Sequence, residues 1–216
     1  MKKILMSIVA CAVFMPIVPA QMSYGIRGML SLPRNPATHH TAVDYGGENA
    51  EVFFQADRVK QTGQIGFLAR YSVKQFWFMS EVMYGQSTTT YSLVDANGYS
   101  ELPIPVYTYD VKTDYLEMPV TAGVKLGVVE VFSGLFLDGT LHEDNALREL
   151  PGYRDFSSGL KGGWLSGVGV NLGKVLVDIR YQQSFGNYAK DYTLAGQDLE
   201  LKNAPGRMSM SAAFVL

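Results

Sequence analysis

The chain has 216 residues, enough for one ordinary domain, with a formal net charge of −2 and 47% hydrophobic residues. This near-neutral balance argues against a nucleic-acid-binding protein, which usually carries a basic patch. No apolar stretch after residue 20 approaches the roughly 20 residues that a transmembrane helix needs. Membrane helices are therefore disfavoured, whereas a membrane β-barrel stays open because its alternating strands leave the average hydropathy ordinary.

The first 20 residues have the layout of a secretory signal peptide. Two lysines precede an apolar stretch that contains Pro16, and Ala20 supplies the small residue expected at a cleavage site. A membrane anchor or a buried helix is the alternative, but the segment is short for a span and Pro16 interrupts it. We therefore predict a signal peptide over residues 1–20 and an exported domain over residues 21–216.

The single cysteine of the chain, Cys11, lies inside this predicted leader. The exported domain would then contain no disulfide, no thiolate nucleophile and no cysteine-based metal site. Its stability would have to come from backbone hydrogen bonding and side-chain packing.

Apolar and polar residues alternate in segments of about ten residues along the rest of the chain, which is typical of barrel strands. In residues 175–185, for example, Val175 and Val177 fall on one parity and Asp178 and Arg180 on the other. Alternate side chains of a strand point to opposite faces, so one face is apolar and the other charged. The eight predicted strands are residues 24–32, 63–73, 76–85, 114–127, 130–141, 164–172, 175–185 and 207–216.

Tight turns and long polar connections alternate strictly between these strands. Turns of two or three residues are typical of hairpins between adjacent antiparallel strands, and they fall at 74–75, 127–129 and 173–174. The long connections are residues 33–62, 86–113, 142–163 and 187–206. All tight turns would lie at one end, as in outer-membrane barrels with short periplasmic turns and long extracellular loops. Within the first connection, residues 51–59 either extend the second strand or form part of a surface hairpin.

The predicted fold is all-β: an eight-stranded antiparallel up-and-down transmembrane β-barrel. Nine charged residues fall on the polar faces of its strands and none on the opposite faces: Arg27, Arg70, Glu81, Glu117, Lys125, Asp138, Asp178, Arg180 and Arg207. One Arg or Lys facing the bilayer midplane costs about 2–4 kcal/mol, so nine outward charges would exceed a folding free energy of about 5–15 kcal/mol. We predict that they face the lumen, either as a structural plug or as a pore lining. The narrow interior of an eight-stranded barrel favours the plug.

Aromatic residues near the strand ends fit the interfacial girdles of a membrane barrel, although aromatics are also enriched in strands generally. The turn-side set is Tyr24, Phe76 and Phe214, and the loop-side set is Tyr84, Trp164 and Phe185.

Four blocks of the sequence resemble the recurring blocks of a known family: YGIRGMLSL, TGQIGFLARYSVKQFWFMSEVMYGQ, DYLEMPVTAGVKLG and VLVDIRYQQSFGN. This is the PorT-like outer-membrane β-barrel family, a porin family common in Bacteroidota. The resemblance covers the exported chain in the family's order and implies a small eight-stranded barrel in the cell outer membrane. A few members take part in protein secretion, and the family has no catalytic motif to carry over. Outer-membrane barrels usually end on an aromatic residue, whereas this sequence ends in Phe214-Val215-Leu216.

No arrangement of residues in the sequence points to a catalytic, metal or cofactor site. The three histidines, His39, His40 and His142, fall in predicted loops without the spacing of metal ligands. His142 lies beside Glu143 and Asp144, but no serine is singled out as a nucleophile. We therefore predict a protein that is not an enzyme and holds no cofactor.

The leading hypothesis is a small outer-membrane protein that contacts membrane lipid with its wall. It would act through extracellular loops or periplasmic turns as a binding, structural or secretion-associated component, with a protein partner there and no nucleic-acid partner. The alternatives are a narrow pore for ions or small solutes, a soluble lipocalin-like lipid binder with inverted faces, and a lipid-modifying enzyme that uses His142.

Overall fold

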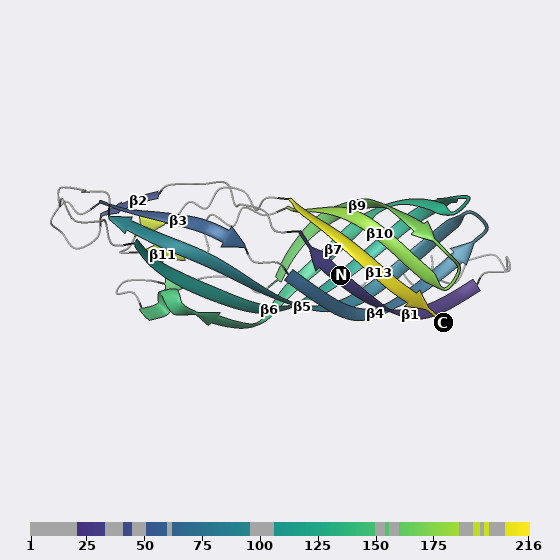
Figure 1. The fold of residues 1–216 in the computed structure, drawn as a ribbon, viewed down its shortest axis with the longest axis horizontal. Coiled ribbons are helices and arrows are strands. Elements are labelled where there is room, and N and C mark those ends of the chain that lie inside the picture. Colours follow the sequence, from purple (N-terminus) through teal and green to yellow (C-terminus); the bar gives the residue numbers. More distant parts are fainter. Residues whose placement is uncertain are drawn as a thin grey trace, which may run out of the picture.

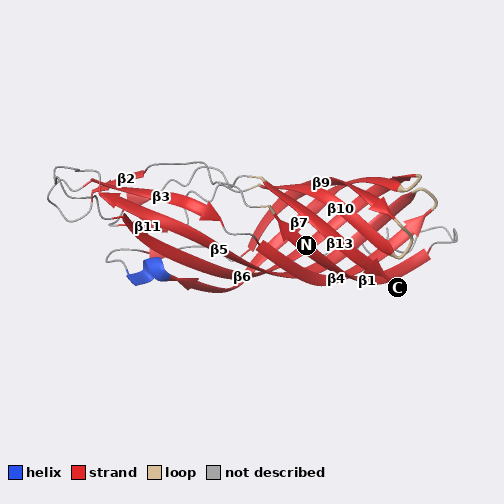
Figure 2. Cartoon of the chain, viewed as in Figure 1, coloured by secondary structure: helices blue, strands red, loops and turns tan. Residues whose placement is uncertain are grey.

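The computed structural model describes residues 21–32, 41–44, 51–59, 62–95, 106–149, 154–155, 160–185, 192–194, 197–198 and 206–216. The predicted signal peptide and the histidines His39 and His40 lie outside the described residues. Figures 1 and 2 show that the described chain is almost entirely β-structure. Within it, no helix is long and apolar enough to cross a membrane.

The strands are β1 (Gln21–Ser31), β2 (Thr41–Asp44), β3 (Glu51–Val59), β4 (Thr62–Val73), β5 (Phe76–Asp95), β6 (Val106–Leu126), β7 (Val129–Asn145), β8 (Arg154–Asp155), β9 (Leu160–Asn171), β10 (Val175–Ser184), β11 (Tyr192–Leu194), β12 (Gln197–Asp198) and β13 (Arg207–Val215). A short 3₁₀ helix, η1 (Ala146–Glu149), follows β7.

Eight antiparallel strands form one up-and-down sheet that closes in a ring, seen on the right of Figure 1. The order is β5-β4-β1-β13-β10-β9-β7-β6, and β6 pairs back onto β5. The first and last ring strands pair directly, from Gly25 with Val215 to Ser31 with Ser209. These are the eight strands that the alternation predicts, and the closed sheet leaves no unpaired edge in the ring.

Burial alternates along each ring strand as the sequence parity requires. In β13, for example, Met208 and Met210 are exposed, whereas Ser209 and Ser211 are buried. A pleated strand closed on itself has only an inside and an outside, so one parity set lines the interior. The apolar part of this interior packs into one cluster, which consists of Leu68, Trp77, Met79, Phe132, Phe136, Leu165, Leu176 and Ala213.

The three predicted tight turns lie together at one end of the ring. Each uses a left-handed residue, namely Lys74 (φ 52°), Gly127 (φ 70°) and Gly173 (φ 82°). Two-residue hairpin loops need positive φ because only that backbone twist matches the flanking strands. We call this end of the molecule the turn end.

At the opposite end, part of the ring wall continues as an extended sheet, which we call the arm (left of Figure 1). It consists of β2, β3, residues 87–95 of β5, residues 106–113 of β6 and residues 142–145 of β7. β3 pairs with β5 directly beyond the stretch that β4 pairs with, so β3 prolongs β4 after a two-residue interruption. Residues 51–59 therefore extend the second predicted strand, and they also form a hairpin with β2.

The arm corrects the prediction that residues 86–113 are a long loop. Most of this segment is strand, because β5 runs to Asp95 and β6 begins at Val106. Its sequence is rich in Thr, Tyr and Val, which favour strands. Ser92 and Val111 in this segment are buried, so its polar composition does not mean a loss of regular structure.

Candidate functional site

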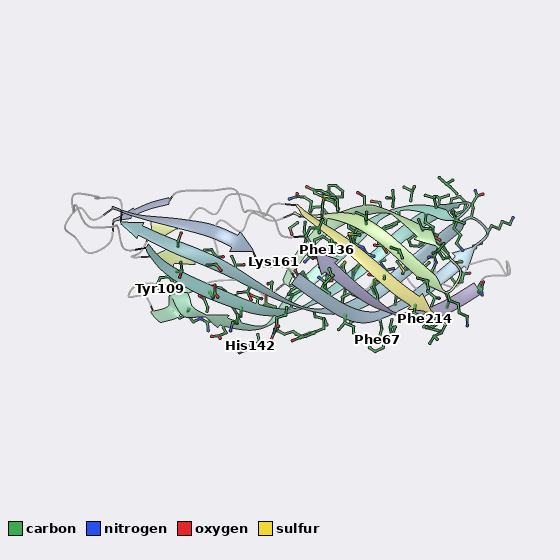
Figure 3. The ribbon with its side chains drawn as sticks, in the orientation of Figure 1. Phe67, Tyr109, Phe136, His142, Lys161 and Phe214 are labelled. Carbon is green, nitrogen blue, oxygen red and sulfur yellow. The ribbon has the colours of Figure 1, made fainter. Side chains whose placement is uncertain are left out.

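The outward face of the ring is apolar. Phe67 is 72% exposed and Ile65 is 66% exposed, and Figure 3 shows Phe67 and Phe214 projecting from the wall. Further exposed outward residues are Ile26, Leu30, Phe78, Val82, Val120, Leu135, Leu137, Val168, Val177, Ile179, Met208 and Met210. No charged residue interrupts this face among the ring residues that the structure describes.

This apolar band ends abruptly where the arm begins. On β5 the outward face changes from Tyr84 to Gln86, and on the paired β6 it changes from Leu116 to Asp114. From Phe76 to Tyr84 the band occupies nine residues of β5, close to the 9–11 residues of a tilted strand that crosses a bilayer. The six aromatic residues assigned to girdles from the sequence are all exposed on the outward face.

A cluster of four charges lies in the middle of the interior. Arg27 on β1 makes ion pairs with Glu81 on β5, at 3.2 Å, and with Asp178 on β10. Arg180 on β10 pairs with Glu81 at 3.1 Å and with Asp178 at 3.0 Å. All four side chains are at most 6% exposed, so two cations and two anions balance each other where water has little access. Such a balance is required because an unpaired buried charge is strongly destabilising.

A second cluster lies toward the arm and is centred on Glu117. This carboxylate pairs with Arg207 and accepts a hydrogen bond from Gln182 Nε2 at 2.9 Å. Arg207 also donates to Gln182 Oε1 at 2.8 Å, and Gln64 donates to the Tyr115 hydroxyl at 2.8 Å. Glu117 is fully buried, whereas the Arg207 side chain is 26% exposed, so Arg207 closes the interior at this end.

A third cluster lies toward the turn end. Arg70 makes a bidentate pair with Glu130, at 2.7 and 3.0 Å, and Asn171 donates to the same carboxylate at 2.8 Å. The Arg70 guanidinium also lies 4.4 Å from the centre of the Trp77 ring, a cation–π contact. The nine interior charges predicted from the sequence do not include Glu130. Its parity with the buried Phe132 was the signal that could have found it.

The nine charged residues predicted to face the lumen are all buried or half-buried in the ring. Seven take part in the three clusters: Arg27, Arg70, Glu81, Glu117, Asp178, Arg180 and Arg207. Lys125 is half-buried at the turn end, where its Nζ donates to Ser72 Oγ at 3.4 Å. Asp138 is half-buried near the arm, where it lies opposite Glu117 and, across the other strand pair, opposite Lys161.

Side chains fill the interior between these clusters. A cavity of about 10 Å³ lies between the Arg27–Asp178 and Arg70–Glu130 pairs, which is about enough for one water molecule. Bulky residues such as Trp77 and Phe132 occupy the same level, with ring centres 5.7 Å apart. At this level a cavity of that size therefore lies beside a charge-balanced set of buried ion pairs.

The outward face of the arm is polar. At the base of the arm Gln86 donates to Asp114 at 2.8 Å, and on the arm itself the Thr90 hydroxyl donates to Asp110 at 2.6 Å. His142 is exposed on this face, opposite Asp114 and outside the ring interior (Figure 3). On the arm, burial raises the pKa of the Tyr91 hydroxyl, and the Glu143 carboxylate raises it further. The described residues contain no group of three side chains suited to hold a metal ion.

No model of a known protein family matches the chain, and a search of curated proteins gives no match.

Proposed function

We propose that the protein is a small outer-membrane β-barrel whose ring crosses the bilayer and whose arm stands outside it. The observation that carries the proposal is the inverted partition of the ring, with an apolar outward face and ion pairs inside. In water such a wall would expose far more contiguous apolar surface than a soluble monomer tolerates. A soluble lipocalin-like lipid binder needs the opposite partition, with an apolar cavity.

We further propose that the barrel is not a catalyst but a membrane-anchored binding or structural component, which works through its arm and loops. The ring offers a rigid base, and β5 and β6 carry the arm outward as direct continuations of the wall. Main-chain pairing along these strands fixes the arm relative to the membrane. A protein partner at the arm is the expected consequence, and a secretion-associated role is one form of it.

A narrow pore is the second candidate, because polar groups run through the interior from Lys125 at one end to Arg207 at the other. The tight ion pairs and the small cavity between them favour a closed plug. Planar-bilayer recording separates the two candidates. We expect a flat trace from the purified protein, and steady single-channel steps would favour the pore.

The experiment that tests the membrane assignment is fractionation followed by gel electrophoresis with and without boiling. A folded membrane barrel stays intact in mild detergent and migrates differently until it is heated. We expect a heat-modifiable band in the outer-membrane fraction. A soluble periplasmic band without a heat shift would overturn the proposal and favour a soluble lipid binder.

A further inference from the structure

The turn end of the ring carries three lysines, one at or beside each tight turn. Lys74 and Lys174 lie in turns and are exposed, and Lys125 is half-buried two residues before Gly127. None of the three pairs with a carboxylate side chain in the described part of the chain, and Lys125 has only the Ser72 hydroxyl as a side-chain partner. This end of the molecule therefore presents free positive charge.

No acidic side chain offsets this charge among the residues described at the turn end. The nearest is Glu130, which is 5% exposed, points into the ring and is neutralised by Arg70. The arm side differs, because the exposed Asp144 and the half-buried Asp110 and Asp114 accompany Lys112 there. The two ends of the ring thus differ in the balance of their exposed charges.

The backbone conformation of Lys74 is independent support for a function of positive charge at the turn end. Its φ of 52° lies in the left-handed region, which glycine adopts easily and other residues adopt at a cost. The other two turns use glycine for the same backbone geometry. A lysine at this strained position destabilises the turn relative to glycine. The presence of its ammonium group is therefore not explained by the needs of the turn.

Lys74 and Lys174 lie directly beside the apolar band. Exposed apolar side chains surround the same turns, namely Phe76, Leu126, Val128, Val129, Leu172, Val175 and Phe214. A cation at the edge of such a band is held at the level of lipid headgroups, because its apolar neighbours are placed in the acyl region.

We propose that the turn end binds the phosphate groups of anionic phospholipids in the leaflet that surrounds it, through the exposed Lys74 and Lys174, while Lys125 at the mouth of the ring interior adds to the positive charge of this end. The inference rests on the proposed membrane insertion and adds a lipid preference to it. One lysine near an anionic membrane surface contributes about fivefold in affinity, so three contribute on the order of 100-fold.

The test is lipid titration of the purified exported chain in detergent, with bound lipids counted by native mass spectrometry. Phosphatidylglycerol is compared with phosphatidylcholine of identical acyl chains, for wild type and for Lys74→Gln/Lys125→Gln/Lys174→Gln. The matched control is Lys112→Gln/Arg148→Gln, which removes exposed cations from the arm side. We expect wild type and control to prefer phosphatidylglycerol by at least tenfold, and the triple variant to lose most of that preference.

A triple variant with the wild-type preference, or a control that loses as much, would overturn the inference. Binding of soluble polyglutamate through the same lysines, without a phosphatidylglycerol preference, would also overturn it and point to an acidic protein partner. Insertion into pure phosphatidylcholine vesicles, followed by the heat-modifiable band, separates the two proposals. Wild type that inserts without lipid preference contradicts only the lysine site, whereas wild type that fails to insert contradicts the membrane assignment.

Discussion

At the scale of single residues, Glu81 holds the central cluster together, because both Arg27 and Arg180 pair with it. Glu81→Gln would leave two guanidinium groups against the single carboxylate of Asp178. Removing one partner of a buried pair typically costs about 3–5 kcal/mol, and we expect a loss of that size in the free energy of unfolding. Urea titration of the detergent-folded protein, followed by tryptophan fluorescence, measures it.

The paired variant Glu81→Gln/Arg180→Met restores the charge balance of the cluster. We expect it to recover part of the lost stability, because the remaining Arg27–Asp178 pair is again neutral. A loss below about 1 kcal/mol for Glu81→Gln alone would show that water reaches the cluster. That result would favour the narrow pore over the closed plug.

Gly123 gives a second residue-scale prediction, because its missing side chain makes room for Trp77 inside the ring. A Cβ at this position would lie 2.4 Å from the indole ring and 2.8 Å from the Val131 carbonyl oxygen. Overpacking of this kind costs about 1–3 kcal/mol, so Gly123→Ala should lower the urea midpoint.

Gly28→Ala is the matched control, since a Cβ there meets no atom within 4 Å on the outward face. We expect its unfolding free energy to stay within about 0.5 kcal/mol of wild type. Equal losses from both changes would mean that backbone freedom, and not the Trp77 contact, decides the effect.

At the scale of elements, the arm and the ring share strands β5, β6 and β7. The arm depends on the ring for its position, whereas closure of the ring does not depend on the arm. Ring closure uses the pairs from Phe76 with Val124 to Gln86 with Asp114, all of which lie below the arm. Replacing residues 88–112 by Asn-Gly would leave Ser87 and Thr113 paired across a two-residue hairpin turn. We expect this variant to keep the heat-modifiable band and to lose binding of any partner at the arm.

Lys74→Asn/Gln75→Gly is the control for that experiment, because it places the same dipeptide in an existing turn of the ring. We expect it to fold as well as wild type, since Asn-Gly suits a turn with positive φ. If the shortened chain failed to fold while the control folded, the arm would be part of the folding unit.

The elements also show what alternation can and cannot predict. The alternation of apolar and polar residues predicts all eight ring strands, because each of them has one apolar face. A shift of one residue in pairing would turn that face inward, so the pattern is strongly specified. It missed residues 86–95, where both faces are largely polar, and it missed residues 106–113, although Tyr107, Tyr109 and Val111 alternate there with Thr108, Asp110 and Lys112. Parity also predicts which charges point inward, but not that Arg27 and Arg180 share Glu81. That pairing depends on closure between strands distant in sequence.

At the scale of the whole molecule, the two ends of the protein differ: the tight turns and their lysines lie at one end and the arm lies at the other. The described residues contain no cysteine, so single reporters can be placed in a Cys11→Ser background. Thr108 is exposed on the arm and Gln75 is exposed in a tight turn. A membrane-impermeant maleimide should label Thr108→Cys on intact cells, and Gln75→Cys only after the outer membrane is permeabilised.

Ser209 provides the matched buried control, since its side chain is 0% exposed within the ring. Ser209→Cys should react only after the protein is unfolded by heat, which shows that labelling reports exposure. Labelling of Gln75→Cys but not Thr108→Cys on intact cells would place the lysines outside and the arm in the periplasm. The expected pattern instead makes the arm the surface that meets external partners, while the lysines face the inner leaflet, because the apolar band between them fixes both ends relative to the bilayer.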